Sequence, residues 1–376
     1  MPNRCKFAVT SKDSALKASK TKKIEVIDLF CGVGGLSFGL KQASLDVIAG
    51  IDIDKACEYP YKANNKTRFI TKSVVELAGS ELKSMYSPSS IKILAGCAPC
   101  QPFSTYSQGP RGTNDAQWSL LGQFSRLVRE TGPDIVTMEN VPALLKHPVF
   151  GDFVNALKQG HGMQFKYHVT YQIVACDQYG LPQTRKRLVL MASRFGDLEF
   201  RRPSKRKSTV LATIGKLAPL TAGQSDPKDP LHQSANLSPI NLQRIQHSRP
   251  GGSWKDWDNS LIANCHRKDS GRSYSSVYGR MKWDEPSPTM TTQFFGFGNG
   301  RFGHPEQDRA LTLREGAMLQ SFPKSYKFVK KGMPVHFSTI GRLIGNAVPP
   351  LLGKVIGESI QIHLKTLSNN EDAIQP

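Results

Sequence analysis

The residues best suited to chemistry follow short apolar segments of the chain, and the first of them is a cysteine in a turn. The segment IKILAGC (91–97) leads directly into APCQP (98–102). The two prolines on either side of Cys100 restrict the backbone around it. Because a thiolate is a strong nucleophile that needs little activation, Cys100 is a candidate for covalent catalysis.

An acid and two arginines lie at the ends of two further apolar segments. Glu139 stands near the end of DIVTMENV (134–141), and Arg185 and Arg187 lie where RLVLMAS (187–193) begins. Desolvation at the end of an apolar strand favours the protonated form of an acid, so Glu139 could hold a proton. Alternation along a strand puts both arginines on one face. A structural salt bridge is the alternative role for each arginine.

A glycine-rich turn near the start of the chain indicates a nucleoside pocket. IEVIDLF (24–30) is followed by CGVGG (31–35) and a helix-like segment, and Asp52 ends the next apolar segment. Glycines allow close approach of a ligand to the backbone, and a carboxylate such as Asp52 could accept hydrogen bonds from ribose hydroxyls. The spacing is not the G-x-G-x-x-G of dinucleotide sites. The pattern therefore favours an adenosine-containing cofactor without a pyrophosphate over NAD, and a simple tight turn is the alternative.

The elements that must position these residues alternate between strands and helices. Apolar, β-branched segments predict strands at 24–30, 47–54, 91–97, 134–141, 169–175 and 187–193. Apolar residues at helical spacing predict helices between 116 and 130 and over 349–367. The alternation predicts an α/β fold with a mainly parallel sheet, whose strand ends meet at one edge where ligands bind.

Composition limits the class of protein and its partners. The chain has 376 residues, 39% hydrophobic and 21% charged, which is typical of a globular protein. No apolar stretch is long enough for a membrane span, and no apolar leader indicates secretion. Lys and Arg number 50 against 30 Asp and Glu, a net charge of +20, so nucleic acid is the leading partner, ahead of an anionic membrane surface. Seven cysteines favour a reducing compartment over a disulfide framework.

Cys97 and Cys100 form a C-x-x-C pair, a pattern found in zinc and redox sites. No second C-x-x-C or H-x-x-x-H pair completes a zinc site. Pro102 and the loop up to Gly112 disfavour the helix that follows a thioredoxin-type pair. We therefore predict neither a metal site nor a redox pair here.

The composition of the sequence changes after residue 193. Loop-rich, polar and basic segments such as RRPSKRK (201–207) follow. Little periodic structure is expected over 195–286, which is typical of a second domain or a long insertion. We predict a basic flexible tail (1–23), a catalytic and cofactor-binding domain (24–193, completed by 340–367), a recognition domain (194–325), a hinge (326–339) and a flexible tail (368–376).

Taken in order, the motifs resemble those of the cytosine-C5 DNA methyltransferase family over most of residues 24–357. The resemblance rests on DLFCGVGG (28–35), PCQ (99–101), ENV (139–141), QTRKR (183–187), RALTLREGAMLQSFP (309–323) and GNAVPP (345–350). It implies a DNA (cytosine-5-)-methyltransferase of bacterial or phage modification type that uses S-adenosylmethionine. The implied fold is α/β, a Rossmann-like class I methyltransferase domain with a mixed, mostly parallel sheet plus a smaller loop-rich target-recognition domain.

The resemblance also implies a covalent mechanism on a cytosine flipped out of the duplex. The Cys100 thiolate would add to C6 and raise the electron density at C5. Glu139 would hydrogen-bond N3 and the exocyclic amine, and Arg187, with help from Arg185, would bind O2. C5 would then take the methyl group of the sulfonium, a base would remove the C5 proton, and elimination would release Cys100. This chemistry requires no metal.

Two further sets of residues are implied by the resemblance. Phe30 would stack on the adenine of the cofactor and Asp52 would bind its ribose, while Ser73 stands where the family often has an acid. The implied cofactor set is Asp28, Phe30, Gly32, Gly34, Gly35, Asp52, Ile53, Ser73, Pro99, Leu120, Asn346 and Val348. The segment 104–117 resembles the family's mobile loop, and the implied DNA-binding set is Ser104, Tyr106, Arg272, Arg280 and Gln293.

Double-stranded DNA is therefore the expected partner, in a restriction-modification system with a cognate restriction endonuclease and without a membrane. The expected location is cytoplasmic and nucleoid-associated. Two alternatives stay open. A tRNA cytosine-C5 methyltransferase would share the catalytic set, although the long basic recognition region favours duplex DNA. A non-catalytic DNA-binding regulator would share the fold, although the presence of Cys100, Glu139 and Arg187 disfavours it.

Overall fold

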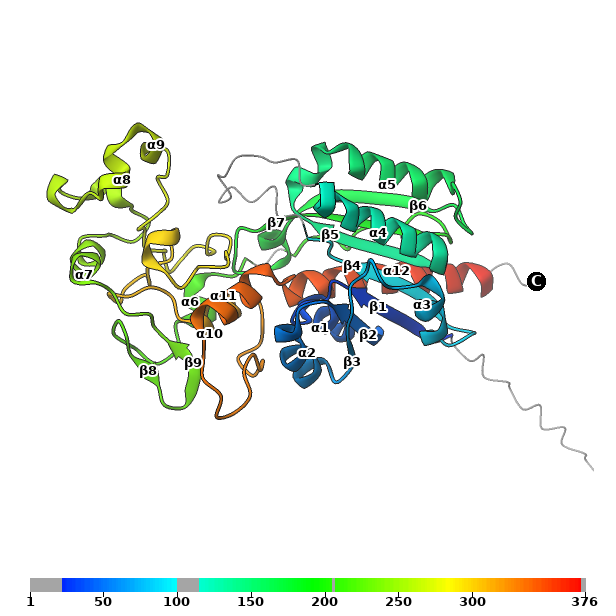
Figure 1. Ribbon diagram of the computed structural model, residues 1–376, viewed down its shortest axis with the longest axis horizontal. Coiled ribbons are helices and arrows are strands. Elements are labelled where there is room, and N and C mark those ends of the chain that lie inside the picture. The colour runs from blue at the N-terminus through cyan, green and yellow to red at the C-terminus, as the bar shows by residue number, and fades with distance from the viewer. Residues whose placement is uncertain (1–21, 100–114, 205–206, 373–376) are drawn as a thin grey trace, which may run out of the picture.

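A seven-stranded sheet forms the centre of the larger of two regions of the molecule (Figure 1). The structure is a computed structural model that describes residues 22–99, 115–204 and 207–372. The strand order is β3-β2-β1-β4-β5-β7-β6. The strands are β1 (Ile24–Leu29), β2 (Asp46–Asp52), β3 (Arg68–Thr71), β4 (Ile91–Gly96), β5 (Ile135–Asn140), β6 (His168–Ala175) and β7 (Lys186–Ser193).

The sheet is mixed and mostly parallel, as predicted. Strands β1 to β5 pair in parallel, whereas β7 is antiparallel to both β5 and β6. Each of the six predicted strands matches an observed strand, with ends that differ by at most two residues. The strand missed from the sequence is β3, a short edge strand whose side chains are half-buried or exposed. It carries no apolar run, because an edge strand is not enclosed on both sides.

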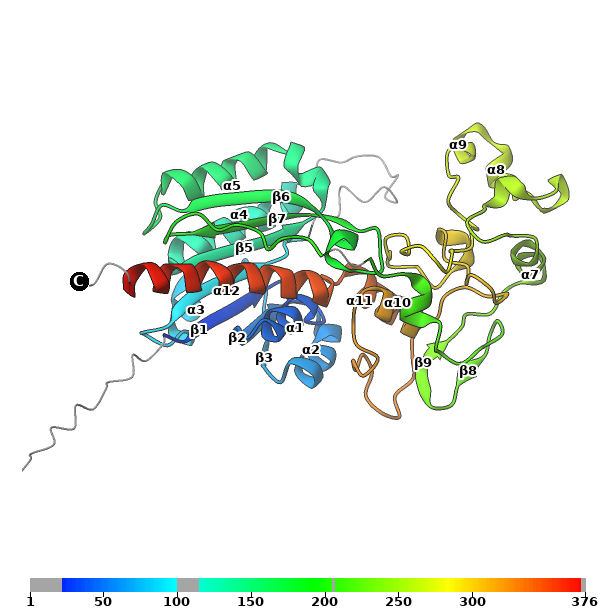
Figure 2. The same ribbon diagram turned by 180° about the vertical axis from the view of Figure 1, so that it is seen from behind.

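Helices cover both faces of the sheet. Figures 1 and 2 show α3 (Gly79–Met85), α4 (Asp115–Thr131) and α5 (Pro148–Gln159) on one face, and α1 (Gly35–Gln42) and α12 (Pro350–Asp372) on the other. Helix α2 (Glu58–Asn65) lies beside α1 near the β2 and β3 edge. The polar end of α12 continues past the predicted end at residue 367, so residues 368–372 are helical rather than part of a flexible tail.

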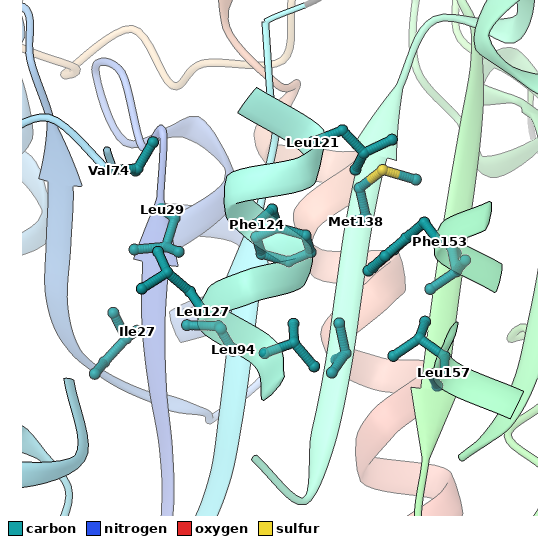
Figure 3. Packing of buried hydrophobic residues seen from close by; sticks show 14 of the residues in the cluster. Ile27, Leu29, Val74, Leu94, Leu121, Phe124, Leu127, Met138, Phe153 and Leu157 are labelled. Carbon is teal, nitrogen blue, oxygen red and sulfur yellow. The ribbon is translucent and has the colours of Figure 1, made fainter. Parts of the chain in front are cut away.

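The core lies between the sheet and these two helical layers. Along β1, Ile27 and Leu29 pack toward α4, and Val26 packs toward α1 and α12. Figure 3 shows Phe124 of α4 among Leu29 and the side chains of β5 and α5. Burying one such large apolar side chain contributes about 1.5–3 kcal/mol. This packing fixes the strands, and therefore the loops at their carboxyl ends.

A second region lies beyond the carboxyl ends of the strands (Figure 1). It has short elements, one apolar cluster of its own, and a second apolar cluster that also includes Val33 and Cys57 of the first region. Its elements are α6 (Val210–Ile214), β8 (Ser225–Asp226), β9 (Asp229–Gln233), α7 (Pro239–Gln246), α8 (Asn264–Arg267), α9 (Asp269–Arg272) and α10 (Leu313–Leu319). Helix α11 (Phe337–Asn346) then leads back to α12. Within the described part of the chain, no helix combines the length and the apolar character needed to cross a membrane.

Candidate active site

The register of the sheet brings three motif segments to one edge. Leu29 of β1 pairs with Gly96 of β4, and Gly96 pairs with Met138 of β5. β1 and β4 therefore end at the same level, β5 continues two residues further to Asn140, and the residue that follows each pairing position lies beside its neighbour. The glycine-rich turn, the segment before Cys100 and Glu139 share this edge, where parallel α/β sheets bind ligands.

Glu139 is a buried acid at this edge. Its side chain is 3% exposed, and two neighbours contact its carboxylate. Arg187 places Nε 2.9 Å from Oε1, and the Cys97 thiol donates a hydrogen bond to Oε2 at 2.8 Å. The Arg187 contact is an ion pair without hydrogen-bond alignment, and Oε1 accepts no hydrogen bond from any described residue. A buried polar atom normally takes part in a hydrogen bond, and among the described residues Oε1 has only the ion pair with Arg187, so it keeps lone pairs that can accept a hydrogen bond.

The two predicted arginines occupy different positions. Arg187 lies at the site, with its Nη1 donating to the carbonyl of Lys186 at 2.7 Å. Arg185 is buried, and it donates to the carbonyl oxygens of Met290 and Gly345 at 3.2 and 3.4 Å. Burial lowers the pKa of the Arg185 guanidinium to about 9, so it stays charged at neutral pH. Arg185 thus joins the start of β7, which carries Arg187, to the segments that contain Met290 and Gly345.

The segment before the predicted nucleophile is tied to its neighbours on both sides. Asn140 donates from Nδ2 to the Ala98 carbonyl at 3.0 Å, and the Cys97 amide donates to the Leu29 carbonyl at 3.3 Å. Pro99 is exposed at the end of this segment. Cys100, Ser104 and Tyr106, all predicted as site residues, lie outside the described residues. Sequence reasoning gave no role to Cys97 or Asn140, although Asn140 stands inside ENV (139–141) and Cys97 lies two residues before PCQ (99–101).

The predicted cofactor turn has an unusual backbone. Phe30, Gly32 and Gly34 have φ angles of 56°, 52° and 89°, in the left-handed region. For Phe30 this conformation is costly, and such strain gathers at functional sites. Asp52 accepts hydrogen bonds from the amides of Gly32 and Asp54 at 2.8 and 2.9 Å. The turn and the predicted ribose-binding acid are therefore connected directly.

The turn fits an adenosine-containing group. A Cβ built on Gly32 would meet no atom within 4 Å, so there is open space in front of the backbone. Beneath it, Asp28 is fully buried, and its Oδ2 accepts a hydrogen bond from Ser37 Oγ at 2.6 Å. Its Oδ1 has no partner among the described residues. Burial, with a contribution from the nearby Asp52, raises the pKa of Asp28 to about 7.

The segment GNAVPP (345–350), called the closing segment, returns to the glycine-rich turn after β1. A Cβ on Gly35 would lie 2.0 Å from the Val348 carbonyl oxygen, so the two backbones are in direct contact. The remaining predicted cofactor residues differ in their exposure to solvent. Ile53 is 69% exposed, and Asn346 is also exposed. Ser73 and Leu120 are half-buried.

The predicted DNA-reading residues divide into one buried and two exposed side chains. Arg280 is buried, and its three guanidinium nitrogens donate to the carbonyls of four residues and to the Asp308 carboxylate. This contradicts the prediction that Arg280 reads DNA, because no donor is left for a base. Arg272 and Gln293 are exposed, and Arg272 pairs with Asp269 at 3.2 Å.

Comparisons with known proteins agree with this arrangement. The model of the family described as C-5 cytosine-specific DNA methylase matches residues 24–362. The Type II methylase M.HgiDII of Herpetosiphon aurantiacus is 50% identical over 352 residues, which cover 92% of this chain and 97% of that protein. The Type II methyltransferase M1.HphI of Haemophilus parahaemolyticus is 30% identical over 340 residues, 89% of this chain and 86% of that protein.

A solved structure resembles the fold. It is a prophage-encoded Escherichia coli protein described as a DNA modification methyltransferase, with a TM-score of 0.69 and 21% identity. The match covers 91% of this chain and all of that one.

Proposed function

Because the chain belongs to the C-5 cytosine-specific DNA methylase family, we propose that Glu139 and Arg187 bind the cytosine that this methyltransferase modifies. The supporting observation is the Glu139 carboxylate, which is buried at the shared strand edge in an ion pair with Arg187 and whose Oε1 accepts no hydrogen bond from the described residues. A carboxyl oxygen can share a proton with N3 of cytosine, and a guanidinium can donate to O2. The two groups thus match the polar edge of the base.

The proposed reaction begins at Cys100. Its thiolate bonds to C6 of the flipped base, and the electron pair of the C5–C6 double bond moves toward C5 and the ring. Glu139 shares a proton with N3, and Arg187 donates to O2, so the charge that develops on the ring is neutralised. S-adenosylmethionine, when bound, supplies the electrophilic methyl group that C5 takes. A base then removes the C5 proton, the C6–S bond breaks, and Cys100 leaves as thiolate. Arg185, tied to Met290 and Gly345, acts by holding the start of β7 and thus Arg187.

We propose the turn after β1 as the site for the cofactor. The open space at Gly32 and the Asp52 carboxylate support this assignment, because a ribose needs acceptors beside a close-approaching backbone. Asp52 keeps lone pairs for ribose hydroxyls, and Phe30 and the exposed Ile53 supply apolar surface for an adenine. The proposed set is Asp28, Phe30, Gly32, Gly34, Gly35, Asp52, Ile53, Ser73, Pro99, Leu120, Asn346 and Val348.

We propose that residues 194–325 recognise a specific duplex DNA sequence, and that the protein works beside a restriction endonuclease. The two relatives named above are Type II methylases, which supports this assignment. The net charge of +20 predicts DNA affinity that falls with salt, as it does when Lys and Arg neutralise phosphates. Arg272 and Gln293 stay candidates for contacts with DNA, together with Ser104 and Tyr106.

Transfer of a labelled methyl group from S-adenosylmethionine tests the proposal. Unmethylated duplex DNA and total tRNA are compared for the wild type, Cys100→Ser and Glu139→Gln. We expect label in DNA, no label with Cys100→Ser, and a loss of about a hundredfold or more with Glu139→Gln. Bisulfite sequencing of the product then locates the modified cytosine. Label in tRNA alone, or full activity of Glu139→Gln, would overturn the proposal.

A further inference from the structure

Cys97 touches the proposed base-binding acid without belonging to the proposed reaction. We propose that Cys97 is a positioning residue: its thiol donates to Glu139 Oε2 and keeps Oε1 turned toward the base. The inference rests on the proposed function, because it concerns the acid that binds the cytosine. It assigns a role to a residue that the motif pattern leaves unexplained.

The contact follows from the register of the sheet. Gly96 of β4 pairs with Met138 of β5, so the next residue of each strand, Cys97 and Glu139, lie side by side. The Cys97 Sγ to Glu139 Oε2 distance is 2.8 Å, and Arg187 lies on the other oxygen. Cys97 after β4 and Arg187 of β7, the two strands that flank β5, thus contact one carboxylate oxygen each and fix the carboxylate plane. A carboxylate on a flexible side chain needs such contacts to hold one orientation.

The thiol is suited to donate rather than to react. Burial, and then the nearby Glu139 carboxylate, raise the pKa of the Cys97 thiol well above its usual value. The sulfur therefore keeps its proton at neutral pH, and a protonated thiol is a weak nucleophile. This separates Cys97 from Cys100, for which a thiolate is required. The C-x-x-C pair thus contains one proposed nucleophile and one hydrogen-bond donor.

The hydrogen bond from the Cys97 thiol contributes most during the proton transfer between Glu139 and the base. When the proton shared by Glu139 passes to N3, negative charge stays on the Glu139 carboxylate. The hydrogen bond from Cys97 to Oε2 strengthens at that moment, because bonds to an ionised acceptor are stronger. The thiol keeps its own proton throughout, so no bond to sulfur at Cys97 is made or broken. An interaction that strengthens on the way to the transition state raises kcat more than it changes KM.

Methyl transfer by Cys97→Ala and Cys97→Ser tests the proposal, with Cys176→Ala as the matched control. Cys176 is also buried, in an apolar cluster, and its Sγ donates to the Val174 backbone carbonyl at 4.0 Å rather than to a carboxylate. We expect Cys97→Ala to lower kcat about tenfold with KM for DNA within about twofold, as for loss of one bond to a charged group. A hydroxyl keeps the donor, so Cys97→Ser should stay within about threefold of wild type. Cys176→Ala should retain wild-type kcat.

A second measurement isolates the addition step. Release of tritium from DNA labelled at cytosine C5 reports attack at C6 and exchange at C5, so it should slow in Cys97→Ala and recover in Cys97→Ser. Equal losses in both variants, at unchanged melting temperature, would assign Cys97 to packing and overturn the proposal. Full activity of Cys97→Ala would also overturn it. If the wild type methylates no DNA, the proposed function itself fails, and the two failures are thus distinguished.

Discussion

Gln183 donates a hydrogen bond from Nε2 to Oε1 of Gln320 at 2.6 Å, and both side chains are fully buried. Gln183 also donates to the Leu319 carbonyl and accepts from the Met290 amide. Gln320 in turn donates to the carbonyl oxygens of Ile344 and Ala347. The pair therefore joins the start of β7, the second region and the closing segment behind Arg185 and Arg187.

Replacing Gln183 should lower the free energy of unfolding strongly, because Gln183 and Gln320 form the junction between the start of β7, the second region and the closing segment. Gln183→Ala leaves three buried partner groups without a hydrogen bond, and each costs about 1–3 kcal/mol when unpaired. Partial relaxation reduces the sum, so we expect a loss of about 2–4 kcal/mol in the free energy of unfolding. Urea unfolding measures it. The exposed Gln246 of α7 is the control, and Gln246→Ala should change the free energy by less than about 0.5 kcal/mol. A loss no larger than that of the control would refute the role of the junction.

Gly35 should tolerate no side chain. Gly35→Ala puts a Cβ 2.0 Å from the Val348 carbonyl oxygen, so α1 or the closing segment must move. Because both border the proposed cofactor turn, we expect weaker binding of S-adenosylmethionine, about tenfold or more, and a lower melting temperature. Calorimetric titration measures the affinity.

Gly151 supplies the matched control for that substitution. A Cβ there meets no atom within 4 Å, and the residue lies inside α5. Gly151→Ala should therefore stabilise the protein by about 0.5–1 kcal/mol and leave cofactor affinity unchanged. Wild-type affinity in Gly35→Ala would show that the two backbones are not in contact.

The central strands could be predicted from the sequence because they are enclosed on both faces. Runs such as IEVIDL and IVTMEN are buried along almost their whole length, so local composition marks them. The second region could be predicted only as loop-rich. Arg280 shows why: its partners are carbonyls of irregular segments, and no periodic pattern marks them. The sequence alone does not distinguish a buried arginine that donates hydrogen bonds to backbone carbonyls from an arginine that is exposed to solvent.

The active site could be predicted as a set of motifs but not as a set of contacts. Glu139 and Arg187 stand at strand ends that local patterns reveal. The hydrogen bond from Cys97 to Glu139 depends on the pairing of β4 with β5, which is a relation between segments 42 residues apart. The same limit applies to Asn140, whose partner Ala98 lies on the neighbouring strand end. A local sequence pattern identifies each residue, whereas the pairing register of the strands determines which residues are in contact.

The buried ion pair of Arg314 and Asp229 should be far more important for stability than an exposed pair. Arg314 donates from Nε and Nη2 to the two carboxylate oxygens at 2.6 and 3.0 Å, linking α10 to β9. Asp229→Ala leaves a buried guanidinium unpaired, which costs about 3–5 kcal/mol. The exposed pair of Arg272 and Asp269 is the control, and Asp269→Ala should cost at most about 1 kcal/mol. Equal losses in urea unfolding would contradict this prediction.

Asp28 should make stability depend on pH. Its folded-state pKa is about 7, against 3.8 for an ordinary aspartate, because it is buried. Between these pH values the native state holds a proton that the unfolded chain releases, so the free energy of unfolding falls as pH rises from about 4 to 7. Asp28→Asn cannot ionise and keeps an acceptor for Ser37. The variant should therefore gain stability relative to wild type across this range, by at most about 4 kcal/mol.

Ser37→Ala should raise the pKa of Asp28 further, whereas Asp28→Asn removes its ionisation. The Ser37 hydroxyl donates to Asp28 Oδ2 and lowers the pKa of that carboxyl, so its removal should move the fall in stability to higher pH. Unfolding by urea at a series of pH values measures all three proteins, and m-values show whether each unfolds in a single transition. Wild-type and Asp28→Asn curves that run parallel from pH 4 to 8 would show that Asp28 is ionised in the folded protein throughout. The buried carboxylate would then need a cationic partner close to Oδ1, which accepts no hydrogen bond from any described residue.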